Sequence, residues 1–288
     1  MPNSVEVNPP AAQLHVSAHG TYWLWSVFAV FAVTLLFTLM WSFIQPRGQR
    51  AFHHIALVIL VVGTIAYFTM ASNLGQAAVT AEFPRSHTGP ITRGVFFARY
   101  VMWALNLSLI ILSVLLGTGA TLSEIFITIV MNLVWIVLLL FGAIVTSTYK
   151  WGYYTLSVLS IFYVLFHINF LSVRSSLLPN RRSSVGGAGY ITFFWLMYPL
   201  IWPFADGGNV ISPTGEAVWY GIVDLLTMPV FVITHLWGAR GVDYDTLGFT
   251  SGKTTDFSGV QHGGHGVGHS TTTTGAPREK VDPGSTAV

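Results

Sequence analysis

The sequence predicts an all-α membrane protein built as a bundle of seven transmembrane helices, and three observations support this. Of its 288 residues, 52% are hydrophobic and only 8% are charged, whereas a soluble domain normally carries about 25% charged residues. The mean hydropathy is +0.62. Seven apolar runs approach or exceed the roughly 20 residues that a helix needs to cross a hydrocarbon core about 30 Å thick. Most of the chain is therefore expected to face lipid or other helices.

The breaks between these runs have the composition of loops. Pro46 and Gly48 lie in the first break, and Pro179 and Asn180 lie in a later one; proline, glycine and asparagine favour turns. Further breaks fall at residues 117–119 and 206–208. The predicted spans are 22–44, 52–74, 93–116, 121–146, 152–173, 187–205 and 215–239.

The orientation follows from the lysines and arginines of the short loops, which are enriched on the cytoplasmic side of a membrane. With the N-terminus outside, the inner loops hold Arg47, Arg50, Arg174, Arg181, Arg182 and Arg240, and the outer loops hold Arg85, Arg93 and Lys150. We therefore expect the N-terminus outside and the C-terminus in the cytoplasm.

The composition divides the chain into three parts. Residues 1–21 are polar and lack a positively charged start, so we expect an extracellular segment rather than a cleaved signal peptide. Residues 22–241 form the seven-helix domain. Residues 242–288 are rich in Gly, Ser and Thr and are expected to be a mostly disordered cytoplasmic tail.

Several classes of function are excluded by composition. The chain has no cysteine, which excludes disulfides and Cys-based zinc sites. The net charge of +2, without a basic run, gives no basis for nucleic-acid binding. Three histidines in the Gly-rich tail, His262, His265 and His269, lack the rigid setting of a metal site, so no metal is expected.

Two charged residues are clear cases of a charge well inside a predicted span, Arg99 in the third and Asp224 in the seventh. A charge within a membrane is costly and usually marks function. We expect the two to form a salt bridge across the bundle, with the hydroxyls of Tyr67 and Tyr198 donating to the carboxylate. A structural ion pair and a proton or ion pathway are both consistent with this arrangement.

Helical periodicity places further residues on the same inward faces. The sixth span presents three aromatic residues at i, i+3 and i+7, and the third and seventh spans each carry a stripe through their charged residue. The stripes are Trp195, Tyr198 and Trp202; Arg99, Met102, Trp103, Asn106 and Ser113; and Asp224, Met228, Phe231 and His235. Three helices thus direct aromatic and polar groups toward one central volume, which is either a packed core or a pocket.

Five segments carry motifs of one known family. ARYVMW at 98–103 is similar to ARY-x-D-W, WLMYPLIW at 195–202 matches W-x-x-Y-P-x-x-W, and the run containing Asp224 is similar to LD-x-x-x-K. KWGYY at 150–154 and AYFTMAS at 66–72 also match family segments. Together they resemble the microbial (type I) rhodopsin family in its fungal branch, over residues 22–241.

This resemblance implies a retinal bound to a lysine four residues after the aspartate, yet that position is Met228. The lysines are Lys150, Lys253 and Lys280, none of them in a predicted span, so covalent retinal is excluded and no cofactor is expected. Met102 and Ser113 stand where pumps keep the counter-ion and proton-donor carboxylates. The implied vestigial pocket comprises Trp103, Asn106, Trp135, Leu139, Trp195, Tyr198, Trp202 and Met228, with Trp135 and Leu139 expected to fill space left by the chromophore.

The same resemblance points to the heat-shock-inducible, opsin-related proteins of fungi. It implies a stress-related, chaperone-like or regulatory role in the plasma membrane rather than an enzyme activity. The implied partners are the lipid bilayer, further copies of the chain and membrane proteins such as a proton-pumping ATPase. Two alternatives stay open: a light-independent proton or ion conductor using Arg99, Asp224, Glu216 and Asn106, and a receptor for a non-covalently bound apolar ligand. The missing carboxylates at Met102 and Ser113 count against conduction.

Overall fold

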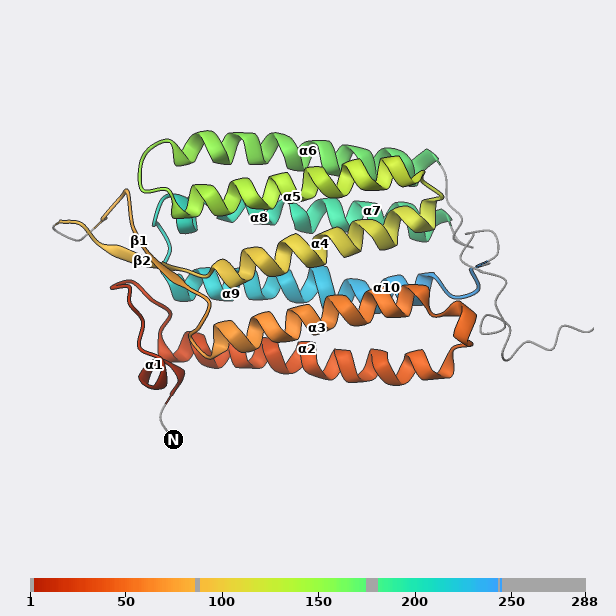
Figure 1. Ribbon diagram of the computed structural model, residues 1–288, viewed down its shortest axis with the longest axis horizontal. Helices are drawn as coiled ribbons and strands as arrows, with labels where there is room; N and C mark the ends of the chain where they lie inside the picture. Colours follow the sequence, from red (N-terminus) through yellow and green to blue (C-terminus); the bar gives the residue numbers. More distant parts are fainter. Residues whose placement is uncertain (1–2, 86–88, 175–180, 243, 245–288) are drawn as a thin grey trace, which may run out of the picture.

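The computed structural model describes residues 3–85, 89–174, 181–242 and 244, whose long helices lie side by side along one axis (Figure 1). Seven helices are long and apolar enough to cross a membrane, which confirms the predicted fold class. Five are continuous: α2 (Ala18–Ile44), α3 (Ala51–Ala71), α4 (Phe97–Thr118), α5 (Leu122–Ile144) and α6 (Lys150–Arg174).

The sixth and seventh spans each contain a change of helix type. The sixth, Val185–Gly207, comprises most of α7 (Arg181–Trp195), then α8 (Met197–Ile201) and the π-helix η2 (Pro203–Gly207). The seventh, Pro213–Gly238, comprises α9 (Pro213–Leu225), the π-helix η3 (Leu226–Val230) and α10 (Phe231–Gly238). Pro229 lies inside η3, where it lacks the N–H of a regular helical hydrogen bond.

Local chemistry sets where the helices begin and end. Thr121 and Glu124 form a reciprocal capping box at the start of α5. The Ser212 side chain accepts a hydrogen bond from the Gly215 amide at the start of α9. Gly119 ends α4 in the left-handed region, at φ 73°, a conformation that glycine adopts without steric cost.

A small β-hairpin and the N-terminal segment cover one end of the bundle (Figure 1). Strand β1 (Ala77–Thr80) pairs antiparallel with β2 (Thr92–Val95). Leu14 forms a bridge with Arg93 of β2, and the short helix α1 (Ser4–Val7) lies nearby. We call this end the hairpin end. The opposite end holds the turn η1 (Arg47–Gln49), Gly119 and the end of α6.

The structure corrects three of the predicted boundaries. The third span begins at Phe97 rather than residue 93, because Arg93 belongs to β2. The second ends at Ala71 rather than residue 74. Lys150, expected in a loop, is the buried first residue of α6.

The predicted tail lies almost wholly outside the described residues. Those outside include Lys253, Lys280 and the three tail histidines. Val242 and Tyr244, which were assigned to the tail, are buried against the helices. The orientation of the two ends across a membrane stays a prediction.

Candidate functional site

Asp224 lies at the centre of the bundle, where three neutral groups donate hydrogen bonds to its carboxylate. The hydroxyl of Tyr67 lies 2.5 Å from Oδ2, and that of Tyr198 lies 2.7 Å from Oδ1. The indole Nε1 of Trp103 donates to Oδ1 at 2.9 Å. These side chains come from α3, α8 and α4, respectively. Both tyrosine hydroxyls donate to the carboxylate, as predicted. Trp103 is an additional donor that the sequence pattern did not predict.

The prediction of a salt bridge between Arg99 and Asp224 is wrong. Arg99 donates instead to the Glu216 carboxylate, and within the described residues no salt bridge joins it to Asp224. Glu216 precedes Asp224 by eight residues, or about 12 Å at 1.5 Å per residue, and so lies nearer the hairpin end. Helical periodicity places Arg99 and Asp224 on inward faces but does not fix the depth that the arginine side chain reaches.

Glu216 belongs to a buried set of four charges, which we call the hairpin-end charge cluster: Arg93, Arg99, Asp206 and Glu216. Arg93 Nη2 donates to Glu216 Oε2 at 2.6 Å, and Arg93 Nε lies 3.6 Å from Asp206 Oδ1. Tyr100 donates to Asp206 Oδ2 at 2.6 Å. Two arginines face two carboxylates, so the cluster is neutral overall.

This neutrality explains how four charges stay buried. Each side chain of the cluster is at most 3% exposed, and a buried charge is tolerated when it is paired and hydrogen-bonded. Burial alone would lower the pKa of Arg93, but the Glu216 and Asp206 carboxylates raise it above its ordinary value. Arg93 therefore stays charged. Its Nη1 also donates to Asn209 Oδ1 and to the Ile211 carbonyl, both at 2.7 Å.

Sequence reasoning missed most of this cluster. The sequence predicts Arg93 at a span boundary and in an outer loop, Asp206 in a loop, and Glu216 in a candidate conduction pathway. A signal was present, since Asp206 lies four residues after Trp202 and Glu216 lies eight before Asp224 on inward faces. Arg93 carried no comparable signal, because its partner residues lie more than 100 positions away.

The residues of the expected vestigial pocket lie together in the core. Trp103, Asn106, Trp135, Leu139, Trp195, Tyr198, Trp202 and Met228 are each 0% exposed. The rings of Trp135 and Trp195 are 6.0 Å apart between centroids, and Trp135 and Tyr198 are 6.3 Å apart. Trp202 stacks on Tyr154 at 5.2 Å.

The position of the missing lysine is packed and has no amine. Met228 is fully buried, and its Sδ accepts a hydrogen bond from Asn106 Nδ2 at 3.3 Å. A thioether cannot form an imine. Lys150, the lysine that the structure describes, starts α6, and its Nζ lies 3.6 Å from Glu82 Oε2. These residues do not fit a covalently bound retinal.

The other half of the bundle holds polar groups in separate, partly buried pairs. Ser113, at the expected proton-donor position, lies 2.9 Å from His235 Nε2. Thr128 lies 2.7 Å from His167 Nδ1. Met102, at the counter-ion position, is 1% exposed. A cavity of about 290 Å³ reaches His235, lined also by Tyr190 and residues of α7 and α10.

Comparison with known proteins places these features in a family context. Residues 18–240 match the family described as bacteriorhodopsin-like protein. Protein FDD123 of Trametes versicolor is 45% identical over 259 residues, covering 89% of this chain and 90% of that protein. The 30 kDa heat shock protein of Saccharomyces cerevisiae is 32% identical over 251 residues, covering 78% and 74%. The structure of a light-driven proton pump from Leptosphaeria maculans matches with a TM-score of 0.74 and 27% identity, covering 78% of this chain and 95% of that one.

Proposed function

Because the chain belongs to the bacteriorhodopsin-like family, we propose that it is an opsin-related protein that works without covalently bound retinal. It is an integral membrane protein. Its proposed role is that of a stress-related, chaperone-like or regulatory protein of the plasma membrane. A plasma-membrane partner such as a proton-pumping ATPase forms part of this proposal.

The observation that carries the proposal is Met228. A retinal Schiff base needs a primary amine. Met228, one turn after Asp224, has instead a thioether, whose sulfur accepts a hydrogen bond from Asn106. The contacts of Asp224 agree with this, because Tyr67, Tyr198 and Trp103 donate hydrogen bonds to its carboxylate, and among the described residues it forms no salt bridge. The aspartate therefore has a structural role that does not depend on a chromophore.

Similarity supports the stress-related part of the proposal. One relative is named a 30 kDa heat shock protein, and 78% of this chain aligns with it. The hairpin-end charge cluster also agrees with a structural role. Each of its charges is paired within the cluster, so the cluster contributes to the scaffold rather than to a reaction.

The retinal test uses the purified full-length chain incubated with all-trans retinal, followed by an absorption spectrum and acid trapping. We expect no protonated Schiff-base band and no retinal mass on the peptide containing Met228. The Leptosphaeria maculans pump, treated in parallel, is the positive control. A retinal adduct on a peptide of α9 to α10 would overturn the proposal.

The stress role is tested in the host cell. Deletion of the gene should lower survival after heat shock equally in light and darkness, and the Met228→Leu variant should restore survival as well as the native chain does. A survival defect that appears only in the light would contradict a light-independent role, and unchanged survival after heat shock would contradict the stress role.

A further inference from the structure

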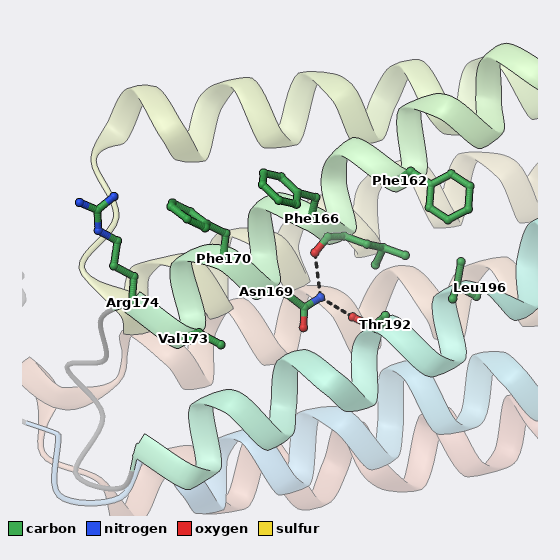
Figure 2. A pocket seen from close by; sticks show the side chains of 9 residues that line it. Phe162, Phe166, Asn169, Phe170, Val173, Arg174, Thr192 and Leu196 are labelled. Carbon is green, nitrogen blue, oxygen red and sulfur yellow. Dashed lines mark hydrogen bonds between the residues drawn. The ribbon is translucent and has the colours of Figure 1, made fainter.

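A groove runs between α6 and α7 on the outside of the bundle, near the end opposite the hairpin (Figure 2). Its volume is about 700 Å³. Phe162, Phe166 and Phe170 of α6 line one side. Thr192 of α7 and Leu196, between α7 and α8, line the other. Because both helices belong to membrane spans, the open side of this groove faces lipid.

The α6 side has a regular chemical pattern. Phe162, Phe166, Phe170 and Arg174 are spaced four residues apart and therefore follow one face of the helix. The rings of Phe166 and Phe170 stack with centroids 5.8 Å apart. The guanidinium carbon of Arg174 lies 5.6 Å from the Phe170 ring centroid. An aromatic row thus ends in a positive charge at the last residue of α6.

The floor of the groove is held by a contact between the two helices. Asn169 Nδ2 donates to Thr192 Oγ1 at 2.6 Å and to the Leu165 carbonyl at 2.8 Å (Figure 2). This link sets the separation of α6 and α7 at mid-groove. The groove is therefore formed before any ligand enters, which lowers the entropic cost of binding.

The charge of Arg174 is available to a ligand. Within the described residues no carboxylate lies within 4.0 Å of it. Glu124, at the start of α5, is instead engaged by the amide and hydroxyl of Thr121 in the capping box. Arginine binds phosphate oxygens through paired hydrogen bonds.

We propose that the groove binds an anionic glycerophospholipid, with one acyl chain along the phenylalanine row and the phosphate at Arg174. The length agrees with this occupant. The twelve residue steps from Phe162 to Arg174 rise about 18 Å at 1.5 Å per residue, and one leaflet contributes about half of a hydrocarbon core about 30 Å thick. The charge also agrees, because anionic headgroups gather at basic residues beside a membrane span. This inference does not depend on the proposed function.

The test measures lipid binding to the purified, delipidated full chain by native mass spectrometry. Phosphatidylserine is compared with phosphatidylcholine of the same acyl chains, so that only the headgroup differs. We expect phosphatidylserine to bind more tightly. Arg174→Gln should weaken its binding about tenfold, in line with the loss of a charged hydrogen-bond partner, while Arg174→Lys should keep most of it.

A second variant tests the groove itself. Leu196→Trp should fill it and weaken the binding of both lipids. Two matched controls should leave binding unchanged: Arg240→Gln, which removes an arginine that stacks on Trp237 near the same end, and Val33→Trp, which enlarges an exposed side chain on α2. Each variant is checked for an unchanged melting temperature and a single gel-filtration peak.

Three outcomes would overturn the proposal. Equal binding of the two lipids by the native chain would remove the headgroup preference. Unchanged phosphatidylserine binding in both Arg174→Gln and Leu196→Trp would place the lipid elsewhere. A sterol that displaces phosphatidylserine, or a dimer that is lost only in Leu196→Trp, would identify a different occupant.

Discussion

The two halves of the bundle bury their polar groups in different ways. In the hairpin half, charges from β2, α4, η2 and α9 meet in one neutral cluster. In the opposite half, polar side chains are held in separate pairs, such as Ser113 with His235. A full charge needs several partners to be buried, whereas a hydroxyl or an imidazole needs one or two. The hairpin half therefore joins four elements through one polar cluster, whereas the opposite half joins its helices two at a time, through single pairs.

The largest expected effect concerns Glu216, which serves two arginines. Glu216→Leu should lower the free energy of unfolding by about 3–5 kcal/mol, because it leaves buried Arg99 without its carboxylate and leaves Arg93 with Asp206 as its remaining carboxylate in the cluster. Denaturant unfolding in mixed micelles measures this. Glu124→Gln, in the half without the cluster, should have a much smaller effect. A loss no larger than that of Glu124→Gln would remove the distinction between the halves.

Arg99 should be coupled energetically to Glu216 but not to the central Asp224. A double-mutant cycle on Arg99 and Glu216 should show a coupling of about 1–3 kcal/mol, as expected for contacting charges. A parallel cycle on Arg99 and Asp224 should be additive to within about 0.5 kcal/mol, because Asp224 is held by neutral donors. Equal coupling in the two cycles would show that cluster and aspartate act as one network.

A smaller effect is expected in the opposite half. Ser113→Ala removes one hydrogen-bond partner of His235 and should cost about 1 kcal/mol of unfolding free energy. Ser26→Ala, on the outward face of α2, is the matched control and should be close to neutral. A cost comparable to that of Glu216→Leu would mean that this half also depends on an extended network.

The smallest response is expected from Met228→Lys incubated with retinal. The new amine lies one turn from Asp224, but Met102 cannot accept its proton, and Trp135 and Leu139 fill space in the core. Little pigment should form, as measured by visible absorbance. Replacing Trp135 and Leu139 with smaller side chains in the same variant should increase the amount of pigment. Full occupancy in the single variant would contradict the filled-pocket argument.

The sequence predicted the helical part of the fold because hydropathy reports burial in lipid directly. It missed the hairpin because Arg93 lies among Ile91, Val95 and Phe96, which an apolar window joins to the third span. Motif resemblance placed Tyr67 and Tyr198 at Asp224. It could not place Arg99, because the depth that a long side chain reaches is set by its partner, and Glu216 and Arg99 are separated by 117 positions.

The hairpin-end charge cluster also constrains the order in which the protein is made. Glu216 follows Arg93 by 123 residues, and at roughly 5–20 residues per second of synthesis the delay is on the order of ten seconds. During that time Arg93 and Arg99 have left the ribosome without their shared carboxylate. Long cationic side chains can wait at the membrane surface with only their stems in lipid. Closure of the hairpin end is thus a late step of biogenesis, completed when the last helix is inserted.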